Sequence, residues 1–185
     1  FHEYLILPTP FFLQLYFMLA DRIDRIKPSA TLEMTSKAAD LRSAGINVIN
    51  LSVGEPDFPT PKNIRNAGKQ AIDVGETRYT PGGGTIALKK AVIKKMSRDN
   101  DLHFKTDEIL ISCGGKHSLY NACQVLFQKG DEVIIFAPYW VSFPDFISIT
   151  GANPVIVHTD ASKQFEPVFD DLISKISKRT KGIII

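Results

Sequence analysis

The chain has 185 residues, of which 44% are hydrophobic, and its 22 basic and 20 acidic side chains nearly cancel. This is enough apolar material for one domain or for most of a larger one, which excludes a disordered or fibrous protein. The balanced charge provides no large cationic face for the phosphates of a nucleic acid. A small molecule or another protein is therefore the favoured partner.

Cys113 and Cys123 are the only cysteines, and no Cys/His cluster has the spacing of a zinc site. A disulfide framework and a structural metal are therefore poorly supported, and a reducing, cytoplasmic setting fits best. We expect both cysteines to be small buried apolar residues.

The first residues are apolar and aromatic, but Glu3, Gln14 and two prolines interrupt them, and they lack a basic leader. This pattern is a poor signal peptide, and it is too interrupted for a transmembrane helix of about 20 apolar residues. Because the composition changes at Met18, we expect translation to begin there naturally. Residues 1–18 are then an extraneous or disordered leader, and no membrane association is expected.

Capping residues and helical spacing predict three helices before residue 101. Gly45 is placed to end the first helix in a left-handed cap, Thr60 and Pro61 to begin the second, and Gly75 to end it. The apolar residues at helical spacing, which we expect in the core, are Met34, Ala38, Leu41, Ile64, Ala67, Ala71 and Val74. The expected elements are a helix at 29–45, a strand at 47–51, a helix at 60–75 and a helix at 86–100.

Beyond residue 107 the predicted elements alternate between strand and helix. Such alternation favours an α/β fold with a mainly parallel sheet covered by helices. Parallel strands carry their ligand-binding loops at their carboxyl ends, and the loop after the last strand is absent, so the chain is expected to be cut. The strands are expected at 108–113, 132–136, 154–158 and 182–185, and the helices at 118–128, 141–150 and 170–177.

The sequence Gly114-Gly115-Lys116-His117 joins an expected strand to an expected helix. Small residues and unpaired backbone amides at a helix N-terminus can bind an anion. Two glycines also suit an ordinary turn, and both readings stay open on this motif alone. Neither GxGxxG nor GxxxxGK[ST] occurs, so the usual dinucleotide and P-loop signatures are lacking.

Two further positions are candidates for ligand binding. Trp140 follows the strand expected at 132–136, at the same sheet edge as Gly114, where its flat indole could stack on a cofactor ring or belong to the core. Gly54 lies between a strand and a capped helix, where it would let a ligand approach the backbone, or simply form part of a rigid proline-fixed loop.

Five motifs, taken together and in order, resemble the signatures of class I pyridoxal-phosphate-dependent aminotransferases, and most of all those of the bacterial aspartate aminotransferases. The resemblance extends from Leu19 to Ile185 and corresponds to the N-terminal portion of such an enzyme. The motifs are Lys-Pro-Ser-Ala-Thr at 27–31, Gly-Glu-Pro-Asp-Phe at 54–58, Arg-Tyr-Thr-Pro at 78–81, Gly-Gly-Lys at 114–116 and Pro-Tyr-Trp-Val-Ser at 138–142.

The resemblance implies a fold-type I enzyme in which a large domain binds pyridoxal 5′-phosphate and a small domain closes over the substrate. Residues 19–60 then contribute to the small domain, and residues 61–185 form an incomplete cofactor-binding large domain. Gly114, Gly115 and Lys116 match the loop that holds the cofactor phosphate, and Trp140 matches the aromatic residue stacked on the pyridine ring, beside the substrate. Tyr79 matches the tyrosine that reaches the partner's cofactor phosphate, which implies a homodimer.

The resemblance also bears on the substrate. Gly54 matches the glycine beside the α-carboxylate, and the Lys116 side chain is expected to serve the distal carboxylate of a substrate such as aspartate. His103 and His158 are expected to be exposed or locally hydrogen-bonded, while His117 lies nearer to the site.

The implied reaction transfers an amino group between an amino acid and a 2-oxo acid. None of Lys163, Lys175, Lys178 and Lys181 lies in a motif that matches the Schiff-base lysine, so this chain alone is expected to be inactive and to contain no catalytic residue. The alternatives are a pyridoxal-phosphate lyase or synthase of the same fold and a non-catalytic remnant.

Overall fold

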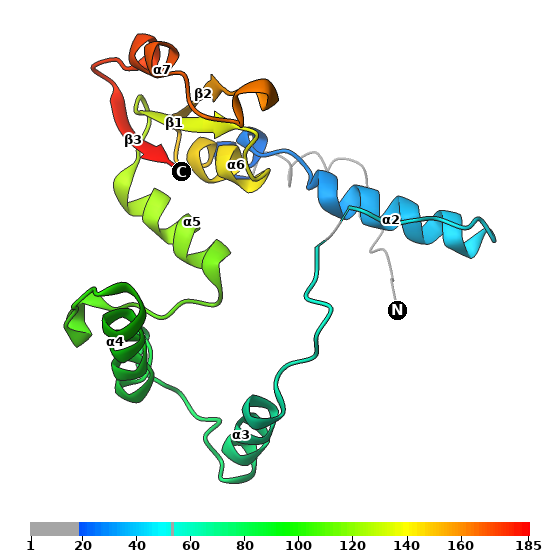
Figure 1. Ribbon diagram of the computed structural model, residues 1–185, viewed down its shortest axis with the longest axis vertical. Helices are drawn as coiled ribbons and strands as arrows, with labels where there is room; N and C mark the ends of the chain where they lie inside the picture. The colour runs from blue at the N-terminus through cyan, green and yellow to red at the C-terminus, as the bar shows by residue number, and fades with distance from the viewer. Residues whose placement is uncertain (1–18, 53) are drawn as a thin grey trace. The chain divides into compact units, whose positions relative to one another are not determined.

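The computed structural model describes residues 19–52 and 54–185 (Figure 1). These residues divide into two units. Unit 1 takes its described residues from 19–27 and 119–185, and unit 2 takes them from 28–118. The leader expected at 1–18 lies outside the described residues.

Unit 1 contains a parallel sheet of β1 (Glu132–Ala137), β2 (Asn153–His158) and β3 (Thr180–Ile184), in the order β2-β1-β3. A helix follows β1 and another follows β2, so the predicted alternation and the predicted parallel sheet are confirmed for this part of the chain. The elements of unit 1 are the 3-10 helix η1 (Asp21–Arg25), β1 (Glu132–Ala137), α6 (Ser142–Ser148), β2 (Asn153–His158), the 3-10 helix η3 (Ala161–Lys163), α7 (Phe169–Lys175) and β3 (Thr180–Ile184).

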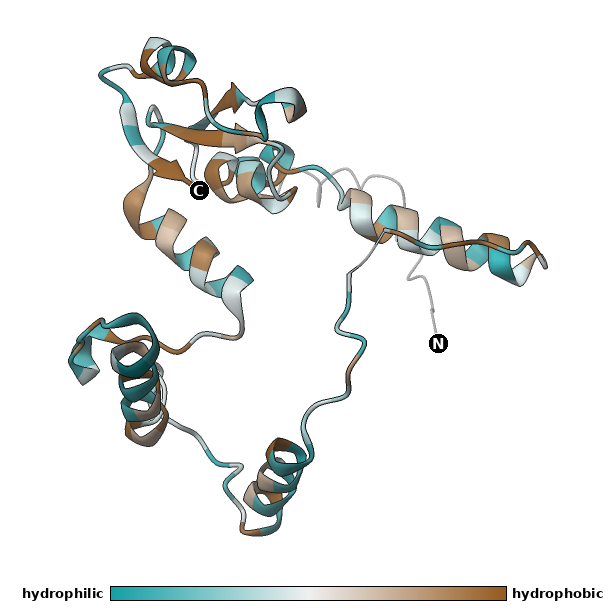
Figure 2. Ribbon diagram, in the orientation of Figure 1, coloured by the Kyte–Doolittle hydropathy of each residue, from teal (hydrophilic) through white to brown (hydrophobic). Residues whose placement is uncertain are grey.

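The core of unit 1 lies along β1. Val133, Ile134 and Ile135 are completely buried, although neighbouring residues of a strand point to opposite faces of the sheet. A strand buried on both faces has a continuous apolar sequence, as is typical of parallel sheets. Ile147 of α6 packs on Val133 and Ile135, and Figure 2 shows the hydrophobic character of β1.

Unit 2 is mainly helical. Ser29 accepts a hydrogen bond from the amide of Leu32 at 3.4 Å, and Thr85 accepts one from the amide of Leu88 at 3.3 Å, so each residue caps the helix that follows it. Gly45, at a φ of 80°, ends the first helix in the left-handed conformation expected from the sequence. The elements are α2 (Ala30–Ser43), α3 (Lys62–Asp73), α4 (Ile86–Asn100), the 3-10 helix η2 (Thr106–Glu108) and α5 (Gly115–Leu126), which continues into unit 1.

The strands predicted at 47–51 and 108–113 are wrong, because neither segment is a strand in the structure. A strand requires a ladder of backbone hydrogen bonds to a neighbouring strand. Within the described chain, Ile111 donates one such bond, from its amide to the carbonyl oxygen of Gly83 at 3.1 Å, and no ladder follows it. Gly114 therefore follows a loop, and its predicted place beside Trp140 at one sheet edge is not supported.

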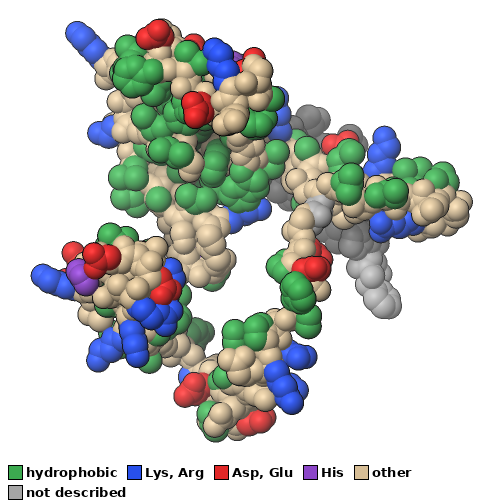
Figure 3. Space-filling view, in the orientation of Figure 1, with side chains coloured by type: hydrophobic (Ala, Val, Ile, Leu, Met, Phe, Trp, Pro, Cys, Tyr) green, Lys and Arg blue, Asp and Glu red, His purple; other side chains and the backbone are tan. Residues whose placement is uncertain are grey.

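Most of the predicted helical core is also wrong. Ala38 is buried, whereas Met34, Ile64, Ala67 and Val74 are exposed and Leu41 and Ala71 are half-buried. Figure 3 shows hydrophobic side chains on the surface of α2 and α3. Helical spacing identifies the apolar face of a helix, but that face is buried only if another element covers it.

Two local predictions also differ from the structure. Pro61, and not Thr60, occupies the cap position of α3, and no side chain caps this helix. Cys113 is exposed because it lies in the loop before α5, whereas Cys123 is buried as predicted.

Candidate functional site

The loop that leads into α5 has the geometry of an anion-binding helix start. Gly114 has a φ of 91°, a conformation that glycine adopts without a steric penalty, and α5 begins at the next residue. The first amides of a helix have no carbonyl acceptor four residues earlier within the helix, and a helix start is therefore a place where an anion can bind. A Cβ added to Gly114 or Gly115 would meet no atom within 4 Å, so a phosphate group can approach this backbone closely.

His117, in the first turn of α5, has a partner that the sequence could not indicate. The amide of Cys113 donates a hydrogen bond to Nδ1 of His117 at 3.1 Å. The imidazole therefore joins the two ends of the glycine turn. His103 and His158 are exposed near element ends, as predicted. Nε2 of His103 lies 3.6 Å from Oδ1 of Asp101.

Trp140 lies three residues after the end of β1 and is partly exposed, with 41% of its surface accessible. Its ring makes edge contacts with Phe143 and Phe146, at centroid distances of 5.6 and 5.8 Å. These T-shaped contacts fix the orientation of the indole while part of it stays accessible. The arrangement suits stacking against a flat ligand ring.

The other two predicted site residues lie in exposed loops of unit 2. Tyr79 is fully exposed in the connection between α3 and α4. Gly54 is exposed, and a Cβ added there would meet nothing within 4 Å. The structure thus brings together Gly114, Gly115 and Lys116, while Gly54 and Tyr79 lie on separate loops and Trp140 belongs to unit 1.

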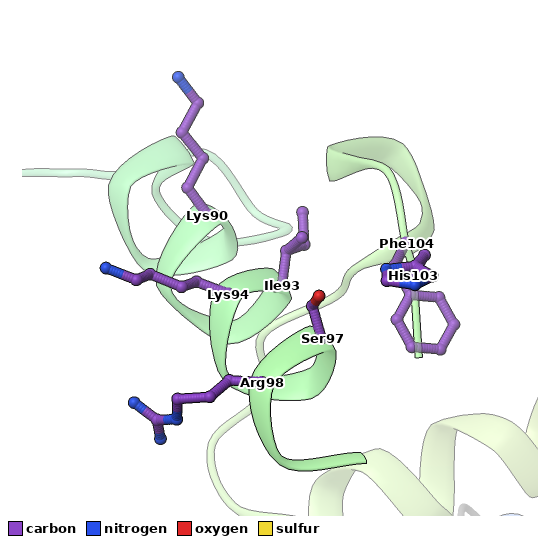
Figure 4. Close-up of a pocket in the computed structure, with 7 residues that line it drawn as sticks. All are labelled: Lys90, Ile93, Lys94, Ser97, Arg98, His103 and Phe104. Atoms are coloured by element: carbon purple, nitrogen blue, oxygen red, sulfur yellow. The ribbon is translucent and has the colours of Figure 1, made fainter. Parts of the chain in front are cut away.

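A cavity of 460 Å³ in unit 2 lies beside the second half of α4 and contains none of the predicted site residues. Figure 4 shows that Lys94 and Arg98 point away from His103 and Phe104, so the basic groups do not converge on one point.

The described chain contains no group of three or more His, Cys, Asp or Glu side chains that could hold a metal ion. No helix within residues 19–52 and 54–185 has both the length and the apolar character needed to cross a membrane.

Comparison with known proteins identifies the family. Residues 46–185 match the family model described as "Aminotransferase class I and II". The chain belongs to this aminotransferase family.

Individual relatives agree with this assignment. The chain is 44% identical over 168 residues to the aspartate aminotransferase of Bacillus sp. strain YM-2, covering 91% of this chain and 43% of the relative. It is 46% identical over 167 residues to the aspartate/prephenate aminotransferase of Nitrosomonas europaea, covering 90% and 42%. The solved structure of the Thermus thermophilus aspartate aminotransferase with maleate matches with a TM-score of 0.85 and 36% identity, covering 90% of this chain and 44% of that one.

The chain therefore spans less than half the length of these relatives, and it corresponds to the N-terminal portion of fold-type I enzymes. Aminotransferases of this family depend on pyridoxal 5′-phosphate. Two features of this chain fit that cofactor: the open glycine backbone at the start of α5 suits a phosphate group, and the oriented, accessible indole of Trp140 suits a pyridine ring.

Proposed function

We propose that these residues form the N-terminal portion of an enzyme that transfers an amino group between aspartate and a 2-oxo acid. The observation that carries this proposal is the Gly114-Gly115-Lys116 turn at the start of α5, in a chain 44% identical to an aspartate aminotransferase. Bound pyridoxal 5′-phosphate would supply the electron sink of the reaction. The residues of this chain bind and orient the reactants.

The proposed role of residues 114–116 is to hold the cofactor phosphate, and that of Trp140 is to stack on the pyridine ring. Gly54 lies beside the α-carboxylate of the substrate, where the absence of a side chain permits close approach. The ammonium group of Lys116 binds the distal carboxylate. The Thermus thermophilus aspartate aminotransferase was solved with maleate, a dicarboxylate, and this supports a preference for substrates with two carboxylates.

The assembly is also a proposal. Tyr79 is fully exposed, which suits a side chain that reaches the cofactor phosphate of a second subunit in a homodimer. We assign residues 19–60 to the small domain and residues 61–185 to the large domain of the complete enzyme, which acts in the cytoplasm.

The 185 residues by themselves do not transaminate under this proposal, because Schiff-base chemistry requires a positioned lysine and no lysine here lies in a matching motif. The test is a chimaera that joins these residues to the remaining part of the Bacillus sp. strain YM-2 enzyme. The chimaera should convert aspartate and 2-oxoglutarate, and the isolated chain should not. Turnover by the isolated chain would contradict this part of the proposal.

The same chimaera tests the competing functions. If these residues belonged to a lyase or synthase, they would support loss or replacement of a substrate group and not transfer to 2-oxoglutarate. If they were a non-catalytic remnant, the chimaera would neither retain the cofactor nor turn over.

A further inference from the structure

Hydrogen bonds fix the turn before α5 on both sides of Gly114. The Gly114 amide donates to the carbonyl oxygen of Ser112 at 2.8 Å, and the Gly114 carbonyl accepts from the amide of Ser118 at 3.3 Å. The bond from the Cys113 amide to Nδ1 of His117, at 3.1 Å, is made by a side chain and closes the turn around residues 114–116.

This closure matters because glycine has more backbone freedom than any other residue. The Gly114 amide is held by Ser112, but the backbone of Gly114 and Gly115 could otherwise vary the direction of the amide that follows. A ligand that must first order the loop binds more weakly than one that meets an ordered loop. A side chain that restrains the turn from outside therefore strengthens phosphate binding without touching the phosphate.

We propose that His117 is a positioning residue for the cofactor phosphate. Its Nδ1 accepts the Cys113 amide and keeps the backbone of residues 114–116 in the conformation that faces the phosphate. This role rests on the proposed function. It requires the imidazole tautomer with its proton on Nε2, because Nδ1 must carry the acceptor lone pair.

Three variants of the full chain separate this role from a general one. His117→Leu removes the acceptor, whereas His117→Asn restores one, since Oδ1 of asparagine lies as many bonds from the backbone as Nδ1 of histidine. His103→Leu is the matched control, because His103 is also an exposed histidine of unit 2.

The first measurement is amide hydrogen exchange of Cys113 by NMR, without cofactor. His117→Leu should accelerate this exchange about fivefold, as expected for the loss of one hydrogen bond. His117→Asn and His103→Leu should stay near the wild-type rate. Unchanged exchange in His117→Leu would overturn the inference, because the bond would then contribute nothing to the order of the turn.

The second measurement is equilibrium dialysis with pyridoxamine 5′-phosphate and with pyridoxamine, neither of which has an aldehyde that reacts with surface lysines. His117→Leu should lower the affinity for pyridoxamine 5′-phosphate about fivefold and leave the affinity for pyridoxamine unchanged. His117→Asn should restore the wild-type affinity for the phosphorylated ligand. If His117→Leu lowered the affinity for both ligands equally, or for neither, the positioning role of His117 would be overturned. The proposed cofactor site would still stand. Failure of the wild-type chain to distinguish the two ligands would overturn the proposed phosphate site and this role together.

Discussion

The guanidinium of Arg179 donates a hydrogen bond from Nε to Oε1 of Glu132 at 2.9 Å. Glu132 is the first residue of β1, and Arg179 immediately precedes β3. The Glu132 amide also donates to the Arg179 carbonyl oxygen at 2.8 Å, and Ser177 donates its hydroxyl to Oε2 at 2.5 Å. A buried carboxylate thus joins two parallel strands at the point where their register shifts.

Replacing Glu132 with glutamine should lower the urea midpoint of unfolding at pH 7. Hydrogen bonds from Ser177 and then from Arg179 hold the pKa of the Glu132 carboxyl below its ordinary value of 4.5. A lowered carboxyl pKa adds stability above the unfolded-state pKa, and this stability is lost as the pH falls through the folded-state pKa. The difference in midpoint between the wild type and Glu132→Gln should therefore narrow below pH 4.5.

Glu166→Gln is the control for this experiment, because Glu166 is exposed. It should leave the midpoint nearly unchanged at pH 7. A constant difference between the wild type and Glu132→Gln from pH 7 down to pH 3 would contradict an electrostatic contribution of this carboxylate.

Gly84→Ala should lower the free energy of unfolding. A left-handed backbone at a non-glycine residue usually costs about 1–3 kcal/mol, and the loss here should exceed that cost. Gly84 has a φ of 96°, and an added Cβ would overlap Cβ and Cγ1 of Ile111. Gly68 of α3 is the control without strain, since its φ is not left-handed and its added Cβ meets nothing within 4 Å. Gly68→Ala should stabilise the helix by about 0.5–1 kcal/mol in urea unfolding. Similar effects of the two substitutions would contradict both the backbone strain at Gly84 and its contact with Ile111.

Much of the secondary structure could be predicted because its signals are local. The bounds of α4, Ile86–Asn100, follow from helical spacing after a glycine-rich turn. The burial of β1 follows from the unbroken apolar sequence of Val133, Ile134 and Ile135. The Gly114 turn could be placed before a helix because glycine tolerates a positive φ.

The failures concern interactions between distant residues. The apolar run Ile109-Leu110-Ile111 suits a strand, but Ile111 finds one backbone partner, Gly83, in place of a neighbouring strand. The apolar residues of α3 recur at helical spacing, but they are not buried, and Ile64 is exposed. The bond from Cys113 to His117 depends on the conformation of the intervening glycines, so residue types alone could not predict it.

Trp140→Ala should lower cofactor retention in the chimaera with the Bacillus sp. strain YM-2 enzyme. Loss of an aromatic stacking partner typically costs about 0.5–1.5 kcal/mol beyond the area buried, or up to roughly tenfold in affinity. Trp140→Phe should retain part of this affinity, because it keeps a flat ring. Cofactor retention is measured from the absorbance of the cofactor that remains after dialysis. An unchanged cofactor affinity in Trp140→Ala would show that the indole serves packing, as in its contacts with Phe143 and Phe146, and not the cofactor.

Lys116→Ala should reduce kcat/KM for aspartate in the same chimaera about 10- to 100-fold, the range expected for loss of a charge-assisted hydrogen bond. An amino acid with an apolar or aromatic side chain has no distal carboxylate, so its kcat/KM should fall much less. Lys94→Ala, at an exposed lysine of α4, is the control for a general loss of positive charge. Equal losses for aspartate and an apolar substrate would instead indicate that Lys116 acts through the turn proposed to bind phosphate, whose backbone it shares with Gly115.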